Sequence, residues 1–138
     1  MTRRILAAII CLLLSACSPS HKSTLGDPQS PGCSAQTLER LYFGSDTPKG
    51  TVTDRQWQKF VEKEITPRFP KGFTVIEANG QWLGKNQKVV RQRTRIVEIL
   101  HSASNEETRA ISEILSTYKQ KFEQEAVLRL VRRTIACL

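Results

Sequence analysis

The stretch of residues 66–84 fixes the direction changes that any fold of this chain must accommodate. Pro67 has no backbone N–H and cannot continue a helix, and Thr66 before it is pushed out of helical geometry. Gly72 then precedes a short apolar run, which favours a strand. The chain is therefore expected to enter this stretch as a helix and to leave it as a strand.

Hydrophobic spacing divides the rest of the chain into short strands and amphipathic helices. Thr53-x-x-Gln56 and Ser104-x-x-Glu107 fit capping boxes, and apolar residues at helical spacing follow each of them. Asn79-Gly80 predicts a hairpin turn after the strand at 73–78. Residues 81–83 are expected to continue the sheet after this turn, before a second turn at 84–88. We expect strands at 36–44, 73–78, 89–100 and 126–131, and helices from Thr53 or Asp54 to Ile65 and from Ser104 to Phe122.

The resulting order β-α-β-β-α-β predicts an α+β fold, a ferredoxin-like sandwich with two helices on one face of an antiparallel sheet. In that topology the first and last strands are neighbours. Cys33 and Cys137 lie at the two ends of the folded part, and an even pair in an oxidising compartment favours a disulfide. The alternative is two free thiols.

The N-terminus predicts export. Arg3 and Arg4 precede ten apolar residues, and Leu14-Ser15-Ala16-Cys17 resembles a bacterial lipobox. We expect residues 1–16 to be cleaved, Cys17 to carry acyl chains, residues 17–35 to form a flexible tether and residues 36–138 to form one domain. An ordinary signal peptide with a chance cysteine is the alternative. Ser18 favours the periplasmic side of the outer membrane if the source is Gram-negative.

The net positive charge of the chain limits the kinds of molecule that it is expected to bind. Cleavage would lower the formal charge from +8 to +6, because Arg3 and Arg4 leave with the signal. Export and the lack of a basic aromatic motif argue against nucleic acid. Anionic lipid headgroups or cell-wall polymers are the alternative to a merely solvated basic surface. The sequence predicts no metal site and no cofactor, and no nucleophile elbow accompanies His101, which we expect at the end of a strand.

Two sets of charged residues are candidates for function. Arg91, Arg93 and Arg95 alternate along one strand, so they share one sheet face; on the open face they would form an anion-binding stripe. The alternative is a solvated face or pairing with Glu77 and Glu39.

Glu64 is the second candidate, because it falls beside the apolar stripe of the first helix. It is either a partly buried acid or base, or a partner for Arg68 that holds the corner between helix and strand. The second interpretation, a structural ion pair with Arg68, is favoured.

A further set of motifs carries a family resemblance. The motifs are Thr66-Pro67-Arg68-Phe69-Pro70-x-Gly72-Phe73-Thr74-Val75, Gly80-Gln81-Trp82, Leu41-Tyr42-Phe43-Gly44 and Tyr118-Lys119-x-x-Phe122-x-Gln124-Glu125-x-Val127-Leu128-Arg129. Together they resemble a bacterial family defined only as domain of unknown function 3574, whose members often look secreted or lipid-anchored. Gln92 departs from the pattern, in which a glutamate tends to occupy this position.

The resemblance implies no activity, so the function follows from the residues alone. We expect a lipid-anchored, non-catalytic domain that binds a ligand or an envelope partner. The alternative is a small enzyme or a ligand-binding homodimer with a cavity between open sheet faces, lined by Tyr42, Gln81 and Arg93. The candidate ligand-binding residues are Tyr42, Arg68, Gln81, Trp82, Arg91, Arg93 and Arg95.

Overall fold

A computed structural model describes residues 28, 30–84 and 87–137. The predicted signal peptide, the predicted lipidation site Cys17 and most of the predicted tether lie outside the described residues. Within them, no helix is long and apolar enough to cross a membrane. The elements are β1 (Cys33–Gly44), β2 (Asp46–Thr47), β3 (Gly50–Thr51), α1 (Asp54–Phe60), the π-helical turn η1 (Val61–Ile65), β4 (Thr74–Leu83), β5 (Val89–His101), α2 (Asn105–Phe122) and β6 (Leu128–Cys137).

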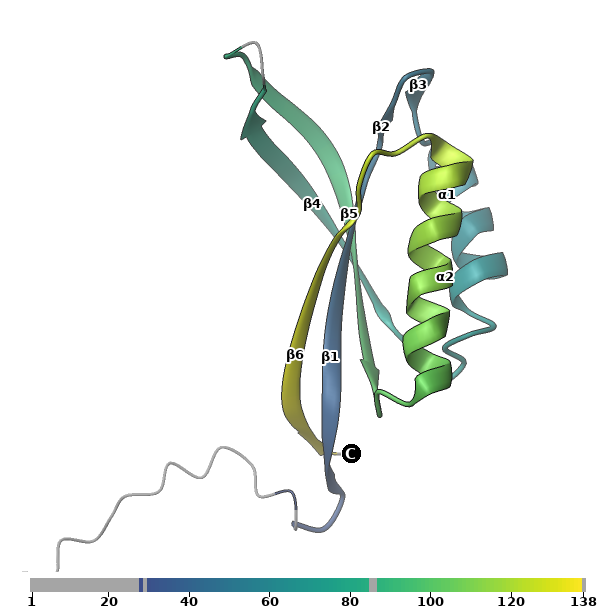
Figure 1. Cartoon of the computed structure of the whole chain (residues 1–138), viewed down its shortest axis with the longest axis vertical. Helices are drawn as coiled ribbons and strands as arrows, with labels where there is room; N and C mark the ends of the chain where they lie inside the picture. The colour runs from purple at the N-terminus through teal and green to yellow at the C-terminus, as the bar shows by residue number, and fades with distance from the viewer. Residues whose placement is uncertain (1–27, 29, 85–86, 138) are drawn as a thin grey trace, which may run out of the picture.

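The four long strands form one antiparallel sheet in the order β4-β5-β1-β6. Helices α1 and α2 lie side by side against one face of this sheet, and among the described residues no helix covers the other face, which is bare there (Figure 1). The predicted α+β architecture, an antiparallel sheet with two helices, is therefore confirmed. We call the bare side the open face; its side chains come from even-numbered positions of the four strands.

The core lies between the sheet and the helices, at odd-numbered strand positions. Phe43 of β1 is at its centre, with ring centroids 4.7–5.8 Å from those of Trp57, Phe60 and Tyr118. The Tyr118 hydroxyl donates to the Gly44 carbonyl at 2.8 Å. Burial raises the pKa of Tyr118 to about 12, so this donor keeps its proton across the physiological range.

Both predicted capping boxes are present. Thr53 and Gln56 exchange hydrogen bonds at the start of α1, and Ser104 and Glu107 do so at the start of α2. The sequence predicted that the first helix runs to Ile65, but the α-helix is shorter. It ends at Phe60 and continues as η1, whose wider turn lets the Thr66 amide reach the Val61 carbonyl at 2.9 Å.

The hairpin turn predicted at Asn79-Gly80 is wrong. Strand β4 runs through this dipeptide, and Gly80 pairs with Gln92 of β5. The ends of β4 and β5 meet instead where the second turn was predicted, and there the Gly84 amide donates to the Lys88 carbonyl at 2.9 Å. Asn-Gly is only a local turn signal, and the longer β4–β5 ladder outweighs it. A side chain at Gly80 would begin 3.1 Å from Thr94 Oγ1, so glycine here permits close strand packing.

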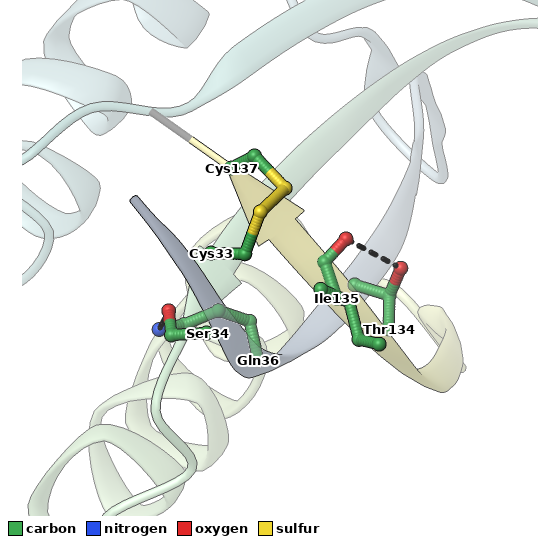
Figure 2. The surroundings of a disulfide bond; sticks show 6 residues. All are labelled: Cys33, Ser34, Gln36, Thr134, Ile135 and Cys137. Atoms are coloured by element: carbon green, nitrogen blue, oxygen red, sulfur yellow. Dashed lines mark hydrogen bonds between the residues drawn. A yellow bond between two sulfur atoms is a disulfide. The ribbon is translucent and has the colours of Figure 1, made fainter. Parts of the chain in front are cut away.

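The disulfide between Cys33 and Cys137 is confirmed, with an S–S distance of 2.09 Å (Figure 2). The two cysteines are partners at one end of the β1–β6 ladder, which runs from this pair to Tyr42 and Leu128. Both strands are longer than predicted. Their ends extend past the helices at the bottom of Figure 1, so the disulfide closes a ribbon that the helices do not cover.

Candidate functional site

A trough of about 630 Å³ is hollowed in the open face, and all four long strands contribute to it. This volume lies within the range of small-molecule sites. The trough is defined by Tyr42, Gly44, Ala78, Asn79, Gly80, Gln81, Trp82, Gln92, Thr94, Ile96, Ala126 and Leu128.

Two aromatic residues, Tyr42 and Trp82, line the trough from different strands. Tyr42 of β1 pairs with Ile96 on one side and with Leu128 on the other. Trp82 of β4 pairs with Val90, near the turn of the β4–β5 hairpin, and 47% of it is exposed. Each of the two side chains offers flat apolar surface with a polar edge.

The amide side chain of Gln92 supplies hydrogen-bonding groups to the same trough. Gln92 lies over the backbone of Gly44, where a side chain on Gly44 would collide with its amide. Gln92 also lines two adjacent hollows, one towards Asp46 and Glu123 and one on the other side of the hairpin beside Arg91. Every residue of the trough is uncharged at neutral pH. Recognition here would rest on apolar contact and neutral hydrogen bonds.

The predicted arginine stripe is not on the open face. Arg95 lies on the helix side of β5, in line with Val97 and Ile99, and is 1% exposed. The prediction failed because alternation shows which residues share a face but not which face the helices cover. The alternative, pairing with Glu77, is what the structure contains.

Each arginine of the stripe has a partner close by. Arg95 binds Asp54 at 2.5 Å, and its guanidinium lies 5.3 Å from the centre of the Trp57 ring. Arg93 binds the same Asp54 and also Glu77, both at 2.8 Å. These bonds, led by that from Arg95, lower the pKa of Asp54. Arg91 donates to its strand neighbour Gln81 at 2.8 Å.

Glu64 has the structural role that the sequence favoured. Arg68 donates to the Glu64 carboxylate at 3.1 Å and to its carbonyl at 2.8 Å. A longer contact of 3.4 Å joins Arg68 to Glu113 of α2. Arg68 therefore links η1 to α2 at the corner where the chain leaves the helix and runs towards β4. It is not among the residues that line the trough.

The sequence did not predict one cluster of charged residues, formed by Glu39, Arg129 and His101. Glu39 is buried on the helix side of β1, where Arg129 donates two hydrogen bonds of 2.6 Å to its carboxylate. His101 lies 3.2 Å from the same carboxylate, and its Nδ1 accepts from the Ala103 amide. The hydrogen bonds that Arg129 donates to Glu39 raise the pKa of Arg129. Only the pairing of β1 with β6, absent from any local pattern, brings Glu39 to Arg129.

The candidate residues thus divide into separate groups. Tyr42, Gln81 and Trp82 come together in the trough, whereas Arg91 and Arg93 border the hollow behind it and Arg95 is buried. In the parts of the chain that the structure describes, no three His, Cys, Asp or Glu side chains are grouped so that they could hold a metal ion.

Comparison with known proteins gives one family and one fold. Residues 38–137 match the family described as "Protein of unknown function (DUF3574)". No curated protein matches the chain. A phage SAM lyase in complex with S-methyl-5'-thioadenosine has a similar structure, with a TM-score of 0.54, 15% identity, and coverage of 75% of this chain and 90% of that one. A phage SAM lyase in its apo state gives a TM-score of 0.55, 17% identity, and coverage of 74% and 85%.

Proposed function

Because the chain belongs to the DUF3574 family of proteins of unknown function, we propose from its own residues that it is a lipid-anchored envelope protein whose domain binds a small ligand. The observation that carries the binding role is the trough on the open face. The lipobox at Cys17 motivates the anchor, and the disulfide agrees with export to an oxidising compartment.

We assign the domain to the ferredoxin-like sandwiches. The strand order β4-β5-β1-β6, with α1 following β1 and α2 following β5, supports this assignment. Two parallel strands separated by an antiparallel one are the mark of this split β-α-β arrangement. In such a fold the helices leave one sheet face accessible, and the trough lies there.

The lining of the trough indicates the chemical class of the ligand. Trp82, Ile96 and Leu128 offer apolar surface, and the amide of Gln92 offers neutral donors and acceptors. An uncharged ligand with a flat apolar body and a hydrogen-bonding edge fits this set. The anionic ligand expected from the arginine stripe has no such support, because Arg93 and Arg95 are paired with carboxylates.

S-methyl-5'-thioadenosine is a suitable probe. It is the ligand of one similar structure, it is uncharged at neutral pH, and it combines a flat base with hydrogen-bonding edges. The chain has two tryptophans, and Trp57 is buried in the core. In the Trp57→Phe variant, fluorescence therefore reports on Trp82 alone.

The test is a titration of the full chain in detergent with this nucleoside. We expect saturable quenching of Trp82 fluorescence in Trp57→Phe, and calorimetric binding to the wild type that Trp82→Ala weakens about tenfold or more. Thr74→Ala, on the same strand outside the trough, is the matched control and should bind as the wild type does. Absence of saturable binding to the wild type, or equal affinity in Trp82→Ala, would refute binding of this ligand class in the trough.

The anchor has its own test. Cys17→Ala should move the protein out of the membrane fraction, because the thioether-linked acyl chains are lost. For a Gram-negative source, density separation of the membranes should place the wild-type protein with the outer membrane. Unchanged membrane partition of Cys17→Ala would rule out lipidation at this residue.

A further inference from the structure

The two solvent-facing sides of the domain differ in chemistry. The outward side of α2 is polar, with exposed residues such as Glu106, Arg109 and Glu113. The open face, in contrast, exposes large apolar side chains from three strands, each between 41% and 56% exposed. They are Ile76, Trp82, Leu100, Leu128 and Leu130.

Most of these side chains lie in two apolar rows that cross the strands. One row crosses the whole sheet, since Ile76 pairs with Ile96, Ile96 with Tyr42, and Tyr42 with Leu128. A second row joins Leu100 to Leu38. Apolar patches of several hundred Å² on a soluble surface usually mark an interaction site.

Charge on the open face is nearly balanced. Between the two apolar rows, Arg40 and Glu98 are opposite each other and form an ion pair within the same domain. Arg132 lies at the edge of the sheet, opposite Leu38. A surface that must meet a copy of itself needs this balance, because like charges would face one another across a two-fold axis.

The size of the face suits a stable dimer. Four strands about 4.8 Å apart and roughly 12 residues long, at about 3.3 Å per residue, give a face of about 19 by 40 Å. This is roughly 750 Å², close to the 800 Å² or so that each partner contributes to a standard interface.

We propose that a second copy of this chain covers the open face, so that the two troughs meet and form one enclosed cavity. This inference rests on the proposed function of the trough. A two-fold axis along the strands places both Cys33 residues at the same end, so both tethers would leave towards one membrane. The same axis places the two troughs opposite each other, at the end of the sheet far from the disulfide. Trp82 and Leu128, half exposed in one copy, would then be covered.

The experiment is sedimentation equilibrium of the full chain in density-matched detergent at high micromolar concentration. We expect the mass of two copies. Leu130→Glu places a carboxylate on the open face outside the trough, opposite Arg40, which already pairs with Glu98. It should weaken association by about 10- to 100-fold, because a surplus charge would be buried in each copy.

Val131→Glu is the matched control. Val131 follows Leu130 on the same strand, it is 58% exposed against 46%, and it points to the other side of the sheet. It should associate like the wild type. A wild-type mass of one copy, alone or with a different protein, would overturn the proposal. Equal weakening by both variants would overturn it as well. Circular dichroism checks that both variants are folded.

The nucleoside titration separates this inference from the proposed function. If the wild type is a monomer but binds the probe in a Trp82-dependent way, the covered face is wrong and the trough function stands. If the wild type is a dimer that Leu130→Glu dissociates, but no probe binds, the trough function fails and the interface stands.

Discussion

Removing the Cys33–Cys137 disulfide is expected to lower the free energy of unfolding by about 4–5 kcal/mol. The bond joins residues 104 positions apart and thus closes nearly the whole described domain into one loop. The β1–β6 ladder already holds the two cysteines opposite each other in the folded state. The cross-link therefore acts mainly by restricting the unfolded chain.

The magnitude follows from loop closure. For a loop of about 104 residues, the chain-entropy relation gives about 4.7 kcal/mol at 25 °C. Domains of this size have total stabilities of only about 5–15 kcal/mol. With a urea dependence of about 2 kcal/mol per M, the midpoint of unfolding should fall by roughly 2.4 M.

The assay is urea unfolding of Cys33→Ser, Cys137→Ser and the double variant, followed by circular dichroism. Each single change removes the same bond, so the three variants should lose similar stability and their effects should not add. Reduced wild-type protein should agree with the double variant.

A loss below about 1.5 kcal/mol would refute this reasoning, since the cross-link would then restrain only the local ends of β1 and β6. A double variant that loses the sum of the two single effects would refute it too. That result would mean that each cysteine contributes through its own packing.

Three further predictions concern buried or capping groups. Tyr118→Phe should lower the free energy of unfolding, measured in urea, by about 1–3 kcal/mol, because the buried Gly44 carbonyl loses its donor. A decrease below about 0.5 kcal/mol, on the order of measurement error, would contradict this. Glu39→Gln should lower the free energy of unfolding by about 2–4 kcal/mol, because Arg129 loses its buried counter-charge. An unchanged urea midpoint of unfolding would contradict that role. The hydroxyl of Ser102 and the Ser104 cap lower the pKa of Glu107 from 4.5 to about 2, so its stabilising effect is complete above about pH 4.5 and is lost as the pH falls towards 2. Glu107→Gln should therefore be less stable than the wild type at pH 7 and equally stable near pH 2; a constant difference would contradict the linkage.

Local chemistry predicted the elements and the disulfide well. Both capping boxes depend on residues three positions apart, which a sequence displays directly. The pairing of Cys33 with Cys137 followed from combining an element order with an even number of cysteines. Asn79-Gly80 misled because its turn preference competes with a ladder whose length depends on the partner strand.

The site was predictable only in part. Arg68, Gln81 and Trp82 are motif residues that the predicted turns do not require, and the structure places Gln81 and Trp82, but not Arg68, along the trough. Tyr42, another motif residue, also lines it. Leu128 joined them only through the β1–β6 register, which no local pattern contains. For the arginines, the sequence showed correctly that they share a face, but the side of the sheet depends on where the helices pack.

The disulfide also determines how a pulling force would enter the domain. A lipid on Cys17 would apply membrane tension at residue 33, the first position of β1. Without the cross-link, such tension would peel β1 from β6 one residue pair at a time, starting at the weakest, uncovered end. With Cys33 bonded to Cys137, the first pair cannot open, and both strands share the load. The domain would then resist pulling along its strands, a mode in which many hydrogen bonds must break together.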